Sequence, residues 1–409
     1  MFDSLKIPNT LAAGPGPGNT DPRVLASFAG SGVADHMQND VLRGMREAKI
    51  MLREVFGTQN IHTFGVAGTG FSGIDCMLSA VLPGDKAVVF VNGTFSGLDG
   101  LTVRMKAASR SDLAANPMNP TPENVIIINT PHGESVTNET IETALAAHQP
   151  KWAMMAHWET GSGRINDIKG FSDACEKYDA MGLVDAVSSL GIADFSIDDY
   201  PGVVGWASCP QKGILCLPLT YAPVSLTDKY IEAIKETGVY GYVHHPILEA
   251  RHWGIIDGAD SETCTYHRTH SGYAVSAFHE SLRILLAYGR VQKAEDYIFY
   301  ESVLSEAIES MGCQVTSNMT SLVVFNLPHD FIGREKELVQ NCRIEGFGIW
   351  PTLSEPTQIR IGFLNQLNQI AITDIIGRFS DAMNNIGITV YKTKVMEQVA
   401  RRFGQRLVA

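Results

Sequence analysis

Short, almost wholly apolar runs alternate with helical patterns through the first half of the chain, and this alternation constrains the fold most. Each apolar run has the length of a strand and few polar side chains, which is typical of a strand buried on both faces. Strands that alternate with helices build a mostly parallel sheet with helices on both faces, so we predict an α/β fold. The expected strands cover residues 61–66, 87–91, 125–128, 152–157, 181–185, 203–208 and 214–223. The expected helices of this part cover residues 41–55, 74–82, 98–107, 139–147 and 168–180.

The pattern changes near residue 291. A long helical stretch at 291–311 is followed by short strands and further helices, which indicates a smaller α+β domain. At the other end, Gly14-Pro15-Gly16-Pro17-Gly18 cannot form a helix or a central strand. We therefore predict an N-terminal arm (1–20), a large domain (21–290) and a small C-terminal domain (291–409).

The composition excludes several classes of protein. The chain is 44% hydrophobic and 19% charged, as globular proteins are. Its net charge is −12 and no block of Lys and Arg stands out, so neither nucleic acid nor an anionic membrane is an expected partner. No apolar run approaches the roughly 18 residues of a membrane span, and residues 1–10 lack the features of a signal peptide.

The seven cysteines and twelve histidines show no spacing typical of a metal site. There is no CxxC and no HExxH motif, so we expect no metal. Scattered cysteines in odd number indicate reduced thiols in a reducing compartment. Together with the lack of a targeting segment, this predicts a cytoplasmic protein.

Polar residues follow the expected strands at the points where the strands end. In an open α/β sheet, ligands bind beyond the carboxyl ends of the strands, so these residues are the candidates for a site. They lie at 68–73, 92–95, 157–161, 185–189 and 209–212.

The first of these segments, Gly68–Gly73, matches the GxGxxG fingerprint of dinucleotide-binding proteins. That fingerprint requires an acidic residue at the end of the next strand, but Asn92-Gly93 stands there, and Asp85 precedes the strand. A nicotinamide cofactor is therefore not favoured. Backbone N–H groups at a helix N-terminus can still hold one phosphate, and Thr69 adds a hydroxyl.

Asp185 and Lys212 suggest the cofactor that would carry this phosphate. Pyridoxal phosphate (PLP) requires a lysine for its imine, a carboxylate at the pyridine nitrogen and an anion site. Lys212 is expected at the end of an apolar strand and Asp185 at the end of another. The combination, in this order along the chain, predicts a PLP site.

Five segments then carry a family resemblance through their order and spacing. They are Gly14–Pro17, Val184–Gly191, Gln211-Lys212, Tyr266–Thr269 and Arg360–Gly362. With these motifs the chain resembles the class V, fold type I aminotransferases, in particular the alanine–glyoxylate and serine–glyoxylate (serine–pyruvate) branch. The resemblance implies the fold of that family: a large domain around a mostly parallel seven-stranded sheet and a smaller α+β C-terminal domain.

The resemblance also implies a role for each matching residue. Lys212 would form the imine with PLP and move the proton between the substrate Cα and C4′, and Asp185 would pair with the pyridinium nitrogen. Arg360 would bind the substrate carboxylate. The other implied cofactor contacts are Thr69, Gly70 and Gln211 at the phosphate, Phe95 and Val187 on the two ring faces, Thr160 near the ring, and Tyr266 and Thr269 from a neighbouring subunit.

Two positions depart from the family pattern. Pro210 precedes Gln211 where the family usually has serine, so a backbone donor and a hydroxyl are missing there. Phe71, another implied cofactor contact, stands where the family often has histidine or tryptophan. Both changes concern packing around the cofactor and the identity of the substrate more than the chemistry.

The function predicted from these residues is a ping-pong transfer of an amino group from a small amino acid, alanine-like or serine-like, to pyruvate or glyoxylate. A homodimer with a shared active site is expected, with Tyr266 and Thr269 crossing to the partner.

Other readings remain open at this stage. A lyase or a desulfurase-like enzyme could use the same scaffold, but Cys342 lies in a helical pattern and not in a mobile loop. A pyridoxamine–pyruvate transaminase would need no anion site. A non-catalytic binding protein with this fold would not need to retain Lys212 and Asp185.

Overall fold

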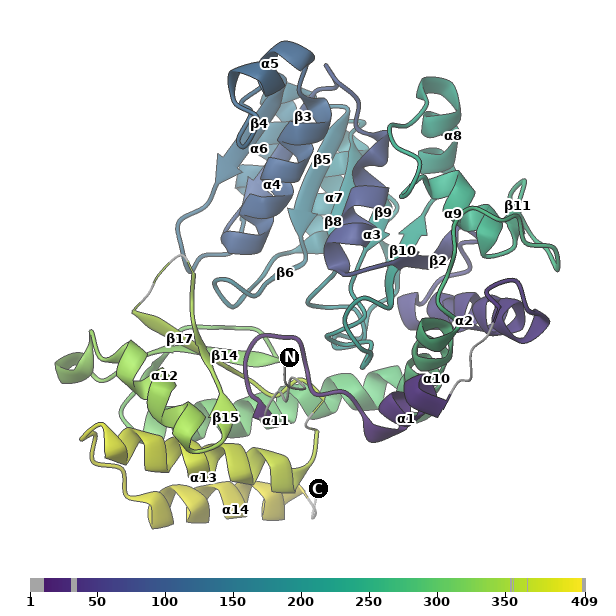
Figure 1. Ribbon diagram of the computed structural model, residues 1–409. Coiled ribbons are helices and arrows are strands. Elements are labelled where there is room, and N and C mark those ends of the chain that lie inside the picture. Colours follow the sequence, from purple (N-terminus) through teal and green to yellow (C-terminus); the bar gives the residue numbers. More distant parts are fainter. Residues whose placement is uncertain (1–10, 31–34, 354, 356, 366, 407–409) are drawn as a thin grey trace, which may run out of the picture. The chain divides into compact units, whose positions relative to one another are not determined.

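The structure is a computed structural model that describes residues 11–30, 35–353, 355, 357–365 and 367–406 (Figure 1). The chain divides into two compact units. The larger comprises Thr20–Glu295, and the smaller combines Asp296–Ala409 with Met1–Asn19. The division falls within one long helix, α11 (Arg290–Ser310). Each unit has its own sheet and is described separately.

The larger unit is built on a seven-stranded sheet with the order β2-β10-β9-β8-β5-β3-β4. Only β10 is antiparallel to its neighbours; the remaining pairs are parallel, which confirms the α/β fold. The strands are β2 (Thr63–Ala67), β3 (Ala87–Val91), β4 (Val125–Asn129), β5 (Trp152–Ala156), β8 (Met181–Asp185), β9 (Val203–Ala207) and β10 (Tyr221–Leu226).

Helices cover both faces of this sheet, as the apolar character of its strands requires. Figure 1 shows α3 and α4 on one face and α6 and α7 on the other. These helices are α3 (Gly70–Met77), α4 (Thr94–Ala107), α6 (Asn138–His148) and α7 (Ile168–Lys177). The unit is completed by α1 (Pro22–Gly30), α2 (Asn39–Phe56), α5 (Arg110–Ala115), α8 (Asp228–Thr237), α9 (Pro246–His252) and α10 (Gly272–Tyr288).

Two expectations for this unit were wrong in detail. The apolar run 214–223 is not one strand, because β10 begins only at Tyr221 and residues 210–214 form turns. Leu215 and Leu219 have φ values of 67° and 63°, a left-handed conformation that no strand contains. Lys212 therefore lies in a turn after β9 and not at a strand end. The helix expected at 74–82 instead begins at Gly70 and ends at Met77.

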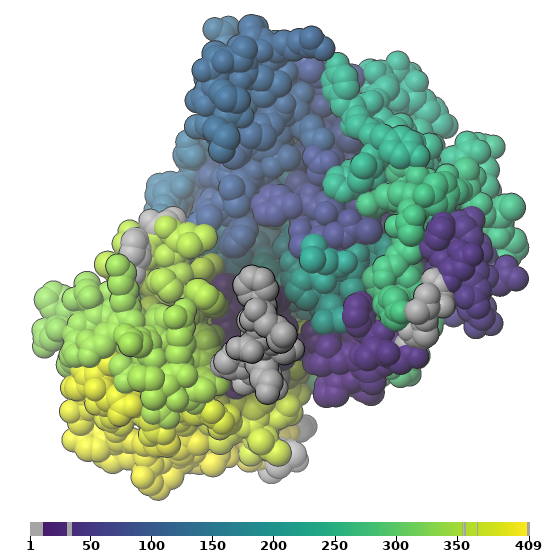
Figure 2. Space-filling view, viewed as in Figure 1, coloured from purple at the N-terminus to yellow at the C-terminus, as the bar shows by residue number. Residues whose placement is uncertain are grey.

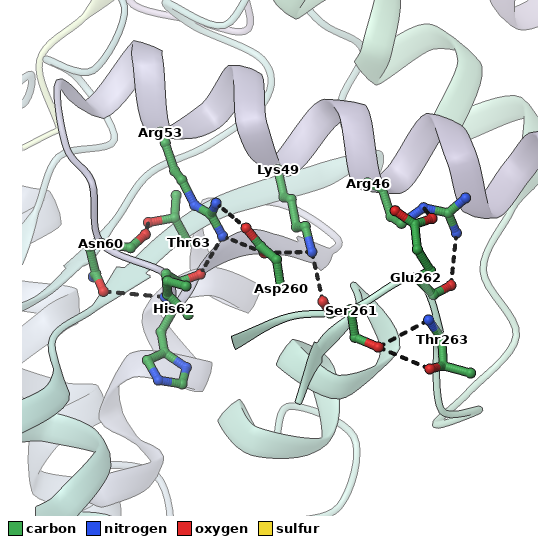
Figure 3. A network of polar contacts seen from close by, with 12 residues as sticks. Arg46, Lys49, Arg53, Asn60, His62, Thr63, Asp260, Ser261, Glu262 and Thr263 are labelled. Atoms are coloured by element: carbon green, nitrogen blue, oxygen red, sulfur yellow. Dashed lines mark hydrogen bonds and ion pairs between the residues drawn. The ribbon is translucent and has the colours of Figure 1, made fainter. Parts of the chain in front are cut away.

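A polar network joins α2 to the hairpin of β11 (Ile255–Ile256) and β12 (Ala259–Asp260) (Figure 3). Lys49 Nζ, which is buried, donates to the Gly254 carbonyl at 2.7 Å and lies 2.8 Å from Asp260 Oδ1. Arg53 Nη1 lies 2.6 Å from Asp260 Oδ2, and this contact holds the pKa of Asp260 well below its ordinary value. In Figure 2, the purple surface of α2 adjoins the green surface of the β11–β12 hairpin. The network fixes the hairpin from which the segment 261–271 departs.

The smaller unit has a four-stranded antiparallel sheet with the order β13-β14-β17-β16. Its strands are β13 (Gln314–Val315), β14 (Leu322–Asn326), β16 (Trp350–Pro351) and β17 (Gln358–Gly362), and its further helices are α12 (Glu335–Ile344), α13 (Gln369–Asn385) and α14 (Lys392–Arg406). The short strand β1 (Leu11–Ala12) pairs with β15 (Phe347–Gly348). Next to it, a side chain at Gly14 would collide with Trp350, which explains the glycine. Within the described residues, none of the helices has the length and apolarity needed to cross a membrane.

Candidate active site

Lys212 is buried where the ends of several strands of the larger sheet converge. Its Nζ donates to Ser188 Oγ at 2.9 Å and to Thr160 Oγ1 at 3.4 Å. The same atom lies 5.4 Å from the centroid of the Phe95 ring. Ser188 follows β8, Thr160 follows the short strand β6 (Trp158–Glu159) that comes after β5, and Phe95 stands in the first turn of α4 after β3. The structure thus brings Lys212, Thr160 and Phe95 together, as the strand-end argument requires.

Asp185 is the last residue of β8 and is also buried. Its Oδ1 accepts a hydrogen bond of 2.7 Å from the backbone N–H of Val187. Burial raises the pKa of Asp185 to about 6, while this hydrogen bond and the charge of Lys212 oppose the rise. The site therefore contains a carboxyl group whose charge is stabilised only by a few nearby donors, and a cationic ligand would stabilise it further.

The N-terminus of α3 approaches Val187 closely. A Cβ atom at Gly70 would lie 2.8 Å from Val187 Cγ2 and 3.1 Å from Cys209 Cβ, so only glycine permits this approach. Thr69 is the N-cap of α3 but makes no capping hydrogen bond with its side chain. Its hydroxyl and the N–H groups of the first turn can therefore hold an anion.

Gln211 and Phe71 flank this region. Gln211 Oε1 is buried and has no hydrogen-bond partner among the residues that the structure describes. Phe71 lies one residue into α3, and its side chain is 42% exposed.

A second lysine holds the turn that carries Lys212. Lys293, in α11, is buried, and its Nζ donates to the carbonyl of Gly213 at 2.7 Å. Burial lowers the pKa of Lys293 to about 7. Sequence reasoning missed this residue, because a lysine in a long helical pattern looks like an ordinary surface residue.

Two acidic residues near Asp185 were missed as well. Glu159 is fully buried; its Oε2 accepts from Ser96 N and Oγ at 2.7 and 2.8 Å, and its Oε1 accepts from Gly161 N at 2.6 Å. It could have been found, since it lies in the strand-end segment 157–161. Asp99 lies inside α4, where no strand-end rule applies. Its pKa is held well above the ordinary value by burial and by the charges of Asp185 and Glu159.

Tyr266 and Thr269 lie in the same unit, on the segment between β12 and α10. Tyr266 is 54% exposed, and its hydroxyl lies 3.3 Å from Thr269 Oγ1. Between them, Arg268 forms an ion pair with the fully buried Glu249. The side chains of Tyr266 and Thr269 thus form a pair on a surface segment, and the ion pair between Arg268 and Glu249 anchors this segment to the unit.

Arg360 belongs to the smaller unit. It lies in β17, is buried, and its Nη2 donates to the carbonyl of Pro351 at 2.9 Å. Cys342 is also in this unit, buried within α12, so it is not the mobile loop cysteine that a desulfurase would need.

The residues of the larger unit fit PLP. A buried lysine amine, a buried carboxyl group and a helix N-terminus made accessible by glycine surround Val187, and the aromatic ring of Phe95 faces the amine. These are the three groups that the imine, the pyridine nitrogen and the phosphate of PLP require.

Comparisons with known proteins agree with this fit. The chain is 31% identical over 391 residues to the alanine–glyoxylate aminotransferase of Mus musculus, covering 93% of this chain and 88% of that protein. It is 26% identical over 356 residues to the (S)-ureidoglycine–glyoxylate transaminase of Bacillus subtilis, covering 82% and 80%. The solved ureidoglycine–glyoxylate aminotransferase of Bacillus subtilis has a TM-score of 0.85 at 21% identity, covering 98% of this chain and 100% of the other. No family model matches the chain.

The likeness to the mouse enzyme extends over most of both chains and includes the segments that carry Asp185 and Lys212. The solved structure shares the arrangement of the sheet and helices. The chain therefore belongs to the alanine–glyoxylate aminotransferase family and is a PLP-dependent aminotransferase of class V with the type I fold.

Proposed function

We propose that the protein transfers the amino group of a small amino acid, alanine-like or serine-like, to glyoxylate. The observation that carries this proposal is that both relatives named above are glyoxylate transaminases, although they differ in the amino donor. Pyruvate is the second acceptor to consider, because it differs from glyoxylate only by a methyl group.

Each residue of the site would then have a defined task. When bound, PLP supplies the electron sink that stabilises negative charge at the substrate Cα. Lys212 would hold the cofactor and move the proton from the substrate Cα. Asp185 would keep the pyridine nitrogen protonated. The further cofactor contacts would be Thr69, Gly70 and Gln211 at the phosphate, Phe71 beside them, Phe95 and Val187 on the ring faces, and Thr160 at the amine.

A panel of amino donors tests the substrate. Alanine, serine and pyridoxamine are each mixed with the holoenzyme, and the visible absorbance of the bound cofactor is recorded before and after addition of glyoxylate or pyruvate. We expect alanine or serine to abolish the band and glyoxylate to restore it. If pyridoxamine alone gives turnover, or no amino acid changes the band, the proposal is wrong.

The homodimer is also part of the proposal, with Tyr266 and Thr269 reaching the phosphate in the partner's site. Exposed apolar side chains at 240–243 adjoin this segment, because Tyr242 donates to the carbonyl of His267 at 2.8 Å. An apolar surface next to ligand-reaching residues supports a two-fold interface in which each copy completes the other's site. Sedimentation of the holoenzyme tests it, and a fully active monomer at nanomolar concentration would refute it.

Arg360 is proposed to bind the substrate carboxylate. A guanidinium binds a carboxylate through two charge-assisted hydrogen bonds, so Arg360→Gln should lower kcat/KM for the amino acid roughly 10- to 100-fold, mainly through KM. The absorbance of the bound cofactor should stay as in the wild type. Arg343→Gln, which removes an arginine stacked on Trp350, is the matched control and should leave KM unchanged.

The cytoplasm is the compartment that we propose. All seven cysteines are free, which supports a reducing environment.

A further inference from the structure

We propose that Asp99 is a positioning residue that carries a proton and donates it in a hydrogen bond to Asp185, so that Asp185 stays ionised opposite the pyridine nitrogen. The inference rests on the proposed role of Asp185 and extends it to a residue outside the strand-end segments.

Asp99 is buried on the face of α4 that packs against the sheet. It is 1% exposed. At the next residue, Gly100, a Cβ atom would lie 3.2 Å from Ile127 Cδ1, so the helix lies directly on the sheet at this point. Asp99 thus has no access to water, and an ionised carboxylate there would need hydrogen-bond donors.

No such donor reaches it from the described part of the chain. Neither carboxyl oxygen of Asp99 accepts a hydrogen bond from any residue that the structure describes. The carboxyl group of Asp185 interacts with that of Asp99 and shifts its pKa. Two carboxyl groups can form a hydrogen bond only when one of them carries a proton. The hydrogen bond that we propose therefore requires one proton on this pair.

The surroundings decide which partner holds the proton. Asp185 accepts the backbone N–H of Val187 and faces the charge of Lys212, and both favour its ionised form. Glu159, the third buried acid near Lys212, accepts three hydrogen bonds. Asp99 has none of these supports, and burial together with the charges of Asp185 and Glu159 raises its pKa well above the ordinary value. Asp99 is therefore the neutral acid of the group.

A neutral Asp99 has a consequence for the cofactor. A hydrogen bond donated to a carboxylate stabilises its charged form and makes it a weaker base. Asp185 then competes less for the proton of the pyridine nitrogen, which stays on the ring. Without the donor, Asp185 would become more basic and would draw that proton toward itself.

The first test measures whether Asp99 is protonated. Infrared difference spectra between the wild type and Asp99→Asn at neutral pH should show the C=O stretch of one protonated carboxyl group in the wild type that the variant lacks. Both the holoenzyme and the cofactor-free protein are measured. Asp296→Asn, which removes a buried carboxylate paired with Arg406, is the control and should leave the band in place. Absence of the band from the wild-type difference spectrum would overturn the proposal.

The second test measures how Asp99 affects protonation of the pyridine nitrogen of PLP. The ¹⁵N shift of ¹⁵N-labelled PLP in the holoenzyme reports protonation of the pyridine nitrogen across a pH series. Asp99→Leu, which removes the donor, should move the ¹⁵N signal at neutral pH toward that of an unprotonated nitrogen, because the more basic Asp185 draws the proton toward itself. Asp99→Asn retains an N–H donor of similar shape and should stay close to the wild type.

The outcomes separate this inference from the proposed function. If Asp99→Leu matches the wild type, or if Asp99→Asn shifts as far as Asp99→Leu, the positioning role is wrong. If Asp99→Leu does not fold, the infrared comparison with the isosteric Asp99→Asn still decides. If the protein binds no PLP, the proposed function fails, whereas the infrared band still shows whether Asp99 carries the proton.

Discussion

The larger unit contains two buried polar clusters that are built from similar side chains but differ in access. The strand-end cluster comprises Asp99, Glu159, Asp185, Ser188 and Lys212. The histidine cluster comprises Glu249, His252, His267 and His270, together with the half-buried Arg268. Both combine buried carboxyl groups with basic groups, and both contain polar atoms without a hydrogen-bond partner in the described structure. The strand-end cluster adjoins the N-terminus of α3, where Gly70 permits a close approach to Val187.

Aromatic packing closes the histidine cluster. His270 stacks on Tyr221 with ring centroids 5.4 Å apart and on His252 with centroids 4.2 Å apart. Its Nδ1 lies 3.0 Å from the Tyr221 hydroxyl. Burial lowers the pKa of His252 to about 4 and that of His270 to about 2, so both rings are neutral near pH 7. Among the residues described by the structure, no group of three or more His, Cys, Asp or Glu side chains could hold a metal ion.

The comparison teaches that buried charge alone does not define a site. In the histidine cluster, Glu249 forms an ion pair with Arg268. This pair fixes the segment that contains Tyr266. In the strand-end cluster, Asp185 bonds to the backbone of Val187, and Val187 is approached closely by the N-terminus of α3, which can hold an anion. Substitutions in the first cluster should therefore change stability, and substitutions in the second should change activity.

Lys212→Ala should have the largest effect. Loss of both the cofactor attachment and the proton carrier should lower turnover by several orders of magnitude and abolish the visible band of the bound cofactor. The melting temperature should fall little, because the substitution removes a buried charge. Lys49→Ala is the matched control: Lys49 is as buried but pairs with Asp260, so the melting temperature should fall and the band should persist. Near-normal transamination by Lys212→Ala would refute the assignment.

Asp185→Asn should come next. A preorganised group of this kind contributes about 3–4 kcal/mol to the transition state, so kcat should fall roughly 100- to 1,000-fold. The fold should persist, because asparagine has the same shape and needs no charge compensation. Steady-state kinetics and a thermal melt measure the two effects. Unchanged rates would mean that another residue meets the pyridine nitrogen.

The sequence predicted the part of this site that follows from strand ends. Asp185, Thr160 and the glycine turn each lie at or shortly after the end of an apolar run, and the strand ends bring such residues to one edge of the sheet. The turn at Lys212 was hidden, because Ile214, Leu215 and Cys216 have the apolar character of a strand. The chain bends there through the positive φ of Leu215, a conformation that an apolar residue type does not reveal.

The partners of the site were harder to predict. Asp99 and Lys293 lie in helices, and their importance arises from contacts with residues that are distant in the sequence, so no local pattern marks them. The histidine cluster joins α9 to a segment with little regular structure. No periodicity exists there from which a prediction could start.

The smallest expected effect concerns Glu249 and the pH dependence of stability. Burial raises the pKa of Glu249 from 4.5 to about 7 against the opposing charge of Arg268. The folded protein therefore binds this proton more tightly than the unfolded chain. The resulting stabilisation is fully present below about pH 4.5 and is lost as the pH rises through 7, by up to about 3 kcal/mol in the free energy of unfolding.

Glu249→Gln removes this titration, so urea unfolding of the two proteins between pH 4.5 and 7.5 isolates it. The stability of the wild type relative to the variant should decline across this range, while kcat at saturating PLP stays the same. Glu232→Gln, on the exposed face of α8, is the control and should show a difference that does not change with pH. A pH-independent difference for Glu249→Gln would mean that Glu249 remains ionised beside Arg268. A large loss of kcat would remove the distinction between the two clusters, because the histidine cluster would then take part in the chemistry.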